Sequence, residues 1–218
     1  MLTNMNTCLI ISGGDFCTLP ASIEYDFVIA CDKGLQYANM LKIVPNLILG
    51  DFDSYEGDVP KAGPSKLLTY PVEKDDSDTM LAIKYALSNG YKHIIIICAL
   101  GGRLDHTIAN LQSMNYVASQ NGICEIISEA EHLITFTGPE IVLPKKDQYS
   151  LSLFSVTDSC HNVSISGAGY DVNDITLNNT FPIGLSNYWK ESSVKISMSD
   201  GIMLIVMSKH LDGFTKGK

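Results

Sequence analysis

The sequence LILGDFDS at residues 47–54 joins a short aliphatic run to a glycine and two aspartates. An uninterrupted aliphatic run of this length is typical of a strand that is buried on both faces of a parallel sheet. In open α/β sheets the ligand site lies at the carboxyl ends of the strands. Asp51 and Asp53 are therefore predicted to lie at that edge, where two carboxylates suit Mg²⁺. An acidic turn that faces solvent is the alternative for an isolated motif of this kind.

Similar apolar runs recur along the first 128 residues. They lie at 8–11, 27–30, 66–69, 93–99 and 124–127. Helical stretches separate several of these runs, which favours a parallel sheet covered by helices. One helix is predicted from an apolar stripe of Met80, Ile83 and Leu87, and Ser77 or Asp78 can cap its start. A second helix is predicted over 104–119, with Leu104, Ile108 and Leu111 on one face. A shorter helix is predicted over 35–41.

After about residue 130 no helical period remains. The apolar or alternating segments there are 133–136, 141–143, 149–156, 163–165, 194–198 and 202–207. Glycine, proline, asparagine and aspartate separate them, which is typical of a small antiparallel sandwich or barrel. We predict the fold class α/β + β, with an N-terminal parallel-sheet α/β domain over 1–130 and a small C-terminal antiparallel β-sandwich over 131–218.

The composition argues against several classes of protein. The 218 residues include 24 acidic and 15 basic side chains, and the net charge of −9 disfavours a nucleic acid as the main partner. The longest apolar run, 94–100, is far shorter than the roughly 20 residues that a membrane-spanning helix needs. The N-terminus lacks the features of a signal peptide. The six cysteines form no CxxC pair, so we expect reduced cysteines and a cytoplasmic location.

Three further strand ends carry glycines and charged residues. Their sequences are SGGD at 12–15, CDKG at 31–34 and GGRLDH at 101–106. Glycines let backbone N–H groups approach a phosphate, and the N-terminus of a helix favours anions. Arg103 adds a planar cation that fits phosphate oxygens, and Asp105 could reach a metal or a substrate hydroxyl. Each turn is a weak signal alone, but together they predict one site at one edge of the sheet.

A further acidic segment, KDDSDT at 74–79, opens one of the predicted helices. One aspartate there complements the helix dipole, but three aspartates within four residues repel one another unless a cation or solvent intervenes. Anion donors combined with several carboxylates predict a metal-bridged phosphate. The chain has no GxxxxGK[ST], GxGxxG, HExxH or GxSxG motif, which argues against Walker-type, dinucleotide, zincin and serine-hydrolase sites.

The ordered motifs CDKG, GDFDS, KDDSDT and GGRLDH, followed by LSN at 185–187 in a β-rich tail, resemble those of the thiamine pyrophosphokinase family. The resemblance covers essentially the whole chain and is strongest over 28–110. It implies an ATP-binding catalytic α/β domain, a thiamine-binding β-sandwich, and a homodimer with the active site at or near its interface. Members of this family transfer the pyrophosphoryl group of ATP to the hydroxyl of thiamine, with Mg²⁺, and release AMP.

The resemblance also implies roles for individual residues. Asp51, Asp53 and Asp78 would hold Mg²⁺, and Arg103 and Asp105 would join them as catalytic residues. The residues implied in ATP binding are Gly13, Gly14, Asp15, Asp32, Lys33, Gly34, Gly101, Gly102 and Arg103. Gln36, like Asp32 and Lys33, falls where the family contacts substrate or nucleotide. The residues implied in thiamine binding are Asp53, Lys74, Asp78, Tyr170, Ser186 and Asn187.

Three points remain open at the level of sequence. Either Asp78 or Asp105 could orient or deprotonate the thiamine hydroxyl. Either Tyr170, where some family members carry tryptophan, or Trp189 could stack on thiamine. The alternative functions are a DxD-type Mg²⁺-dependent phosphatase with Asp51 as nucleophile, and a non-catalytic nucleotide or thiamine sensor.

Overall fold

The computed structural model describes residues 5–50, 65–69 and 75–210. The chain divides into two compact units, one that ends at Glu129 and one that begins at Ala130. The fold class is as predicted: the first unit is an α/β unit with a parallel sheet, and the second is built from antiparallel strands. What residues 1–130 and 131–218 each bind stays a prediction.

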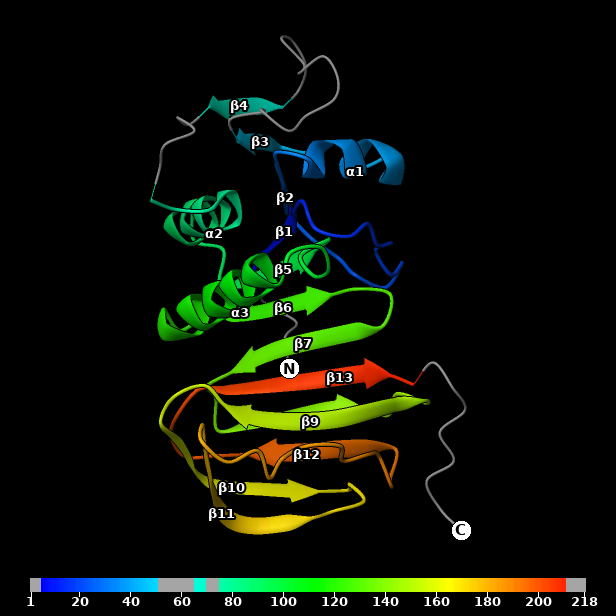
Figure 1. The fold of residues 1–218 in the computed structure, drawn as a ribbon, viewed down its shortest axis with the longest axis vertical. Helices are drawn as coiled ribbons and strands as arrows, with labels where there is room; N and C mark the ends of the chain where they lie inside the picture. The colour runs from blue at the N-terminus through cyan, green and yellow to red at the C-terminus, as the bar shows by residue number, and fades with distance from the viewer. Residues whose placement is uncertain (1–4, 51–64, 70–74, 211–218) are drawn as a thin grey trace. The chain divides into compact units, whose positions relative to one another are not determined.

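The first unit is a parallel sheet flanked by helices (Figure 1). Its strands are β1 (Thr7–Ile11), β2 (Phe27–Cys31), β3 (Leu47–Gly50), β4 (Lys66–Thr69), β5 (His93–Ile97) and β6 (Ile123–Ile127). They lie in the order β4-β3-β2-β1-β5-β6, and all neighbouring pairs are parallel. Its helices are α1 (Gly34–Leu41), α2 (Asp78–Ser88) and α3 (Leu104–Ser119). Because the strands are parallel, their carboxyl ends share one edge of the sheet.

Both faces of the central strands are covered. Every residue of β1 and of β5 is buried, which confirms the prediction of strands without a solvent-exposed face. Leu9 and Ile11 on β1 pack into the same cluster as Leu35 and Ala38 of α1. Figure 1 shows α1 on one side of this sheet and α2 and α3 on the other.

Two of the predicted strands differ in detail from the structure. β4 is largely exposed, because it is the edge strand of the described part of this sheet. β5 ends at Ile97 instead of continuing to residue 99, because Cys98 takes a left-handed backbone conformation with φ 55°. That turn sends the chain from β5 toward Gly101 and Gly102.

The buried face of α2 differs from the predicted one. Its buried residues are Thr79, Ala82, Ile83 and Ala86, whereas Met80 and Leu87 are only half-buried. Of the predicted apolar stripe, Ile83 is fully buried and the other two residues are partly buried. Thr79, Ala82 and Ala86 are small and let the helix approach the sheet closely, while Ile83 fills the contact and Met80 and Leu87 lie at its flanks.

The bounds of α3 were predicted correctly, but its buried face was not. Leu104 is 73% exposed, Ile108 is 49% exposed and Leu111 is half-buried. The buried residues are Asn110, Ser113, Met114, Val117 and Ala118. Two of these are polar, and their side chains donate to the carbonyls of Ala99 and Ala109, which offsets the cost of burying them.

A close backbone approach at the start of α1 requires a glycine. A Cβ atom on Gly34 would lie 2.0 Å from the carbonyl oxygen of Ile11, so the backbone would have to move. We expect Gly34→Ala to lower the free energy of unfolding by about 1–3 kcal/mol, measured by urea denaturation. The matched control is Gly13→Ala, whose Cβ would make only an ordinary 3.5 Å contact with Lys33. Equal stability of the two variants would contradict this account.

The second unit is made of antiparallel strands. They are β7 (Glu131–Phe136), β8 (Glu140–Pro144), β9 (Tyr149–Ser155), β10 (Ser159–Ser166), β11 (Val172–Asn178), β12 (Ser193–Ser197) and β13 (Met203–Lys209). One group is ordered β7-β13-β9 and the other is a separate sheet ordered β11-β10-β12-β8. Alternate residues such as Met203 and Ile205 on β13, and Val194 and Ile196 on β12, are buried and form the core of this unit.

β11 was absent from the predicted segments. Its sequence VNDITLN is mostly polar, and Leu177 is its one fully buried residue among those described. The strand forms because β10 offers a backbone partner, not because its own side chains need burial. None of the helices in the described residues of either unit has the length and apolar composition needed to cross a bilayer.

Candidate functional site

The carboxyl ends of β1, β2 and β5 meet the first residues of α2 and α3 around one cleft of about 670 Å³. Of the residues singled out in the sequence, those that line it are Gly13, Gly14, Asp15, Asp32, Lys33, Asp78, Gly101, Gly102, Arg103, Asp105 and His106. They come from four segments that are distant in the chain. The cleft therefore combines glycine-rich turns, two basic side chains and several carboxylates in one place.

Several expected site residues do not line this cleft. Gly34 packs against Ile11, so its role is in positioning α1, and Gln36 is exposed on the same helix. Asp51, Asp53 and Lys74 lie outside the described residues.

The glycine-rich turns after β1 and β5 are bonded to each other. The amide of Gly14 donates to the carbonyl of Cys98 at 2.7 Å, and the amide of Asp15 donates to the carbonyl of Leu100 at 2.9 Å. These two amides are engaged within the chain. Gly101 has φ +80°, and a Cβ there would overlap the carboxylate of Asp15. The close packing of the two turns is what requires glycine at this position.

The start of α2 is fixed relative to β1. Ser77 is the N-cap, since its hydroxyl accepts from the amide of Met80 at 3.2 Å, and this settles the choice between Ser77 and Asp78. The buried hydroxyls of Ser12 and Thr79 are 2.8 Å apart. Asp78, the first residue of α2, is thereby placed in the cleft beside the turn that follows β1.

The neighbouring Asp76 has a different role. Its carboxylate pairs with Lys84 at 2.6 Å on the surface of α2. The acidic segment is thus divided between a surface ion pair and a cleft residue, and sequence spacing alone does not separate the two.

Arg103 and Asp105 form an exposed pair at the start of α3. The guanidinium contacts the carboxylate through both Nε–Oδ1 at 3.1 Å and Nη2–Oδ2 at 2.5 Å. The hydrogen bond from Arg103 lowers the pKa of Asp105, and that bond also raises the pKa of Arg103. Asp105 therefore stays ionised and is a weak proton acceptor, while Arg103 keeps its charge near the glycine turns.

Two side chains that hold the turns at the cleft were not identified from the sequence. Asn110 is buried, and its amide donates to the carbonyl of Ala99 at 2.7 Å, which holds the turn before Gly101. Tyr37 donates to the carbonyl of Gly14 at 2.8 Å, and the ammonium of Lys33 lies 5.3 Å from its ring. Neither residue belongs to a glycine or acidic motif. The one signal in the sequence is that each lies in a helix that directly follows such a motif, Tyr37 in α1 and Asn110 in α3.

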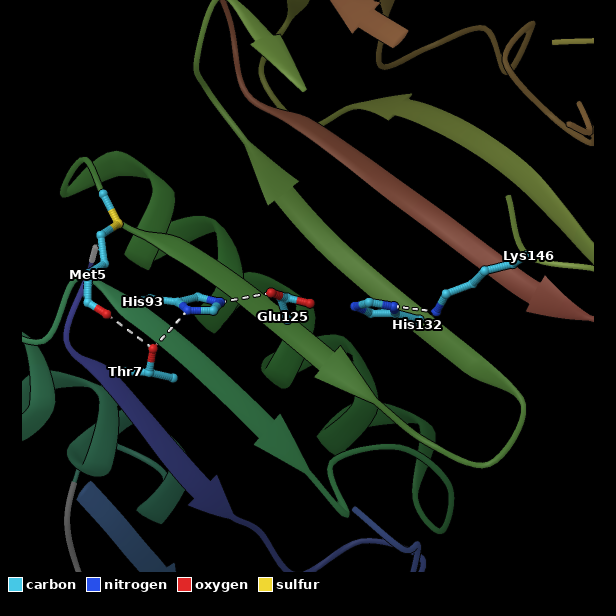
Figure 2. Close-up of polar contacts among 6 residues, drawn as sticks. All are labelled: Met5, Thr7, His93, Glu125, His132 and Lys146. Atoms are coloured by element: carbon cyan, nitrogen blue, oxygen red, sulfur yellow. Dashed lines mark hydrogen bonds and ion pairs between the residues drawn. The ribbon is translucent and has the colours of Figure 1, made fainter. Parts of the chain in front are cut away.

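A row of buried polar side chains in mutual contact lies near the amino-terminal ends of β1 and β5, at the end of the sheet opposite the cleft (Figure 2). The ring of His93 is 3.0 Å from the hydroxyl of Thr7 through Nδ1, and 2.7 Å from the carboxylate of Glu125 through Nε2. An open depression of about 1020 Å³ lies beside them. The described residues that line it include no lysine or arginine, so it does not suit a polyanionic ligand.

In the second unit, Asn187 organises the expected thiamine-binding residues. Its Oδ1 accepts from the amides of Tyr170 at 3.0 Å and Tyr188 at 2.9 Å, and its Nδ2 donates to the carbonyl of Tyr170 at 2.9 Å. Asn187 is 7% exposed, so it positions Tyr170 and leaves little surface for a ligand. Ser186 beside it has φ +60°, and its amide donates to Ser152.

The two candidate aromatic residues differ in exposure. Tyr170 is 62% exposed and meets the ring of Tyr188 edge-on at 6.0 Å. Trp189 is 5% exposed, and its Nε1 donates to the carbonyl of Leu143 at 3.1 Å. Trp189 is therefore a core residue of this unit, and Tyr170 is the aromatic side chain that a ligand could reach.

Comparison with known proteins identifies close similarities over most of the chain. The family model described as thiamin pyrophosphokinase, catalytic domain, matches residues 22–126, and the model described as thiamin pyrophosphokinase, vitamin B1 binding domain, matches residues 140–203. The thiamine pyrophosphokinase of Bacillus subtilis is 29% identical over 215 residues, covering 94% of this chain and 99% of the relative.

Solved structures agree. The crystal structure of thiamine pyrophosphokinase from Bacillus subtilis superposes with a TM-score of 0.85 at 26% identity, covering 94% of this chain and 100% of that one. A thiamin pyrophosphokinase family protein from Enterococcus faecalis gives 0.80 at 25% identity, covering 94% and 99%. Yeast thiamin pyrophosphokinase, at 13% identity, shares the fold with a TM-score of 0.71 and coverages of 97% and 90%.

Proposed function

The chain belongs to the thiamine pyrophosphokinase family, and we propose that its cleft transfers the pyrophosphoryl group of ATP to the hydroxyl of thiamine, producing thiamine diphosphate and AMP. The observation that carries this proposal is the cleft at the carboxyl ends of β1, β2 and β5. It holds anion donors and carboxylates together, as a metal-bound triphosphate requires.

Phosphate binding falls to the glycine turns and the basic side chains. The amides of Gly14 and Asp15 are engaged by the carbonyls of Cys98 and Leu100, so we assign phosphate contacts to the backbone of Gly13, Gly101 and Gly102 instead. Lys33 and Arg103 supply positive charge at the same cleft. An incoming phosphate would compete with Asp105 for the bidentate face of Arg103.

The donor set of the cleft fits Mg²⁺, because its potential ligands are carboxylate oxygens. Within the described residues no three His, Cys, Asp or Glu side chains group to hold a metal ion, and two of the three proposed ligands lie outside them. We assign the ion to Asp51, Asp53 and Asp78. When bound, Mg²⁺ would neutralise charge on the triphosphate oxygens.

The choice of the residue that orients the thiamine hydroxyl favours Asp78. Asp105 is held by Arg103 and its pKa is lowered, which makes it a poor proton acceptor. Asp78 lies at the head of α2, where the Ser12–Thr79 bond fixes the helix. Asp32 completes the acidic lining of the cleft at the end of β2.

The residues that we propose for thiamine binding are Tyr170, Ser186, Asn187, Asp53, Lys74 and Asp78. We further propose a homodimer with the active site at or near its interface, which light scattering coupled to gel filtration would test.

A cytoplasmic location is in keeping with six free cysteines.

The decisive experiment is a product assay. The purified chain is incubated with ATP, Mg²⁺ and thiamine, and nucleotides and thiamine esters are separated by chromatography. AMP and thiamine diphosphate in equal amounts support the proposal. ADP with thiamine monophosphate would replace it with a simple kinase, whereas binding of both ligands without AMP would indicate a sensor.

Replacement of Tyr170 tests the aromatic contact with thiamine. Tyr170→Ala is expected to raise KM for thiamine by about 2- to 30-fold, because a ring stacked on the cationic thiazolium contributes about 0.5–2 kcal/mol. KM for ATP should change little. Tyr170→Phe keeps the ring and is the matched control, with KM near that of the unmodified chain. Equal KM values for the alanine and phenylalanine variants would remove Tyr170 from the site.

A further inference from the structure

Cys17 and Cys98 form a close thiol pair directly behind the glycine turns. Their Sγ atoms are 3.7 Å apart although 80 residues separate them in the chain, and the side chains are 2% and 1% exposed. All six cysteines are free thiols. Neither Cys17 nor Cys98 is among the residues that line the candidate cleft.

The two residues are held together by reciprocal hydrogen bonds. The amide of Cys17 donates to Sγ of Cys98 at 3.4 Å, and the amide of Cys98 donates to Sγ of Cys17 at 3.2 Å. The left-handed backbone of Cys98, φ 55°, turns its amide toward Cys17. This arrangement keeps both sulfurs facing each other, so a bond between them needs a small movement: the separation must fall from 3.7 Å to about 2.05 Å.

Cys17 also differs in acidity from the other cysteines of the core. Burial raises the pKa of Cys8 to about 12, as expected for an isolated buried thiol. The hydrogen bond from Cys98 lowers the pKa of Cys17 to about 7, and the pKa of Cys98 is raised in turn. Cys17 is therefore the better nucleophile of the two.

We propose that Cys17 and Cys98 are a redox-sensitive pair that forms a reversible disulfide with a low-molecular-weight disulfide as oxidant. The thiolate of Cys17 attacks one sulfur of the oxidant and releases one small thiol, leaving a mixed disulfide. Cys98 then loses its proton to solvent and attacks Sγ of Cys17, releasing the second small thiol. The protein loses two hydrogens, and one small disulfide is reduced to two thiols.

Access to the buried pair comes from the segment after β1. Residues 12–20 contain no helix or strand, and Phe16 and Thr18 on either side of Cys17 are exposed. Such a segment opens locally at a lower cost than a strand of the sheet. A small disulfide can thus reach Cys17 without unfolding of the unit.

The consequence for the cleft rests on the proposed function. The carbonyl of Cys98 accepts from the amide of Gly14, and Cys17 lies two residues beyond Asp15. Drawing the two sulfurs together shifts both ends of the turn that carries Gly13 and Gly14. We expect KM for ATP to rise about tenfold in the oxidised protein, because displacing a phosphate-binding turn by about 1 Å is costly.

The test uses the full chain, reduced and then incubated with glutathione disulfide, followed by acid quenching, alkylation and peptide mass mapping. The expected product is one crosslink between the peptides containing Cys17 and Cys98, reversed by dithiothreitol. Cys98→Ser should instead accumulate a glutathione adduct on Cys17. Cys8→Ser, which changes a buried thiol of β1, is the matched control and should still form the crosslink.

Absence of the Cys17–Cys98 crosslink in the unmodified chain, under conditions that oxidise a reference dithiol, would overturn the proposal whatever the activity. A crosslink that leaves KM for ATP unchanged would overturn its link to the cleft. If the crosslink forms but the reduced chain makes no AMP from ATP and thiamine, the proposed function fails and the redox pair stands.

Discussion

Asp78→Asn is expected to lower kcat for AMP formation by about 100-fold or more while the chain keeps its fold. Asp78 is the first residue of α2 and lines the cleft. The helix itself is capped by Ser77 and held against β1 by the contact between Ser12 and Thr79. Asparagine keeps the shape of the side chain and removes its charge. The loss therefore falls on the reaction and not on the helix.

The matched control is Asp76→Asn, two residues earlier in the same acidic segment. Asp76 pairs with Lys84 on the surface of α2, so this change removes the same charge outside the cleft. We expect near-normal kcat for this variant and superimposable circular dichroism spectra for both. If Asp78→Asn kept near-normal turnover at saturating Mg²⁺ and ATP, or if both variants lost activity equally, Asp78 would have no special role.

The strands of the first unit and the position of the cleft could be predicted because they depend on local sequence. Runs such as 8–11 and 47–49 are short and wholly apolar, which identifies strands of a parallel sheet, and parallel strands bring their carboxyl ends to one edge. The turns SGGD, CDKG and GGRLDH follow such strands directly, so their meeting at the cleft follows from topology alone.

The buried faces of the helices were harder to predict, because burial there depends on the partner surface. Leu104 and Ile108 satisfy the helical period yet are largely exposed, while Asn110 and Ser113 are buried since each finds a carbonyl to bond. The helical spacing of apolar residues shows that a helix has an apolar face, but it does not show which residues of the helix contact the sheet.

Side-chain networks between distant segments could not be predicted at all. The contact of Cys17 with Cys98, and the bonds of Asn187 to the backbone of Tyr170, join residues that no local pattern relates. The same holds for Trp189, whose burial against Leu143 separates it from Tyr170 as a candidate ligand contact. Such networks need the strand order and register, which a single sequence does not determine.

His93→Leu is expected to lower the free energy of unfolding by about 3–5 kcal/mol. His93 and Glu125 are 2.7 Å apart, and both side chains are more than nine-tenths buried. Removing the imidazole leaves the carboxylate of Glu125 buried without that partner, and the hydroxyl of Thr7 loses its contact as well. Urea denaturation of the purified variant measures the change.

The double variant His93→Leu/Glu125→Leu tests whether the two side chains stabilise the fold as a pair. If the cost of the single change is a carboxylate left buried without His93, removing that carboxylate should restore much of the stability, because apolar side chains replace a buried pair at little cost. The double variant should then be more stable than His93→Leu alone. Because the pair lies at the edge of the sheet opposite the cleft, KM for ATP should stay unchanged in every folded variant. A double variant as unstable as the sum of the two single changes would mean that His93 and Glu125 act independently, and that their short contact contributes nothing to the fold.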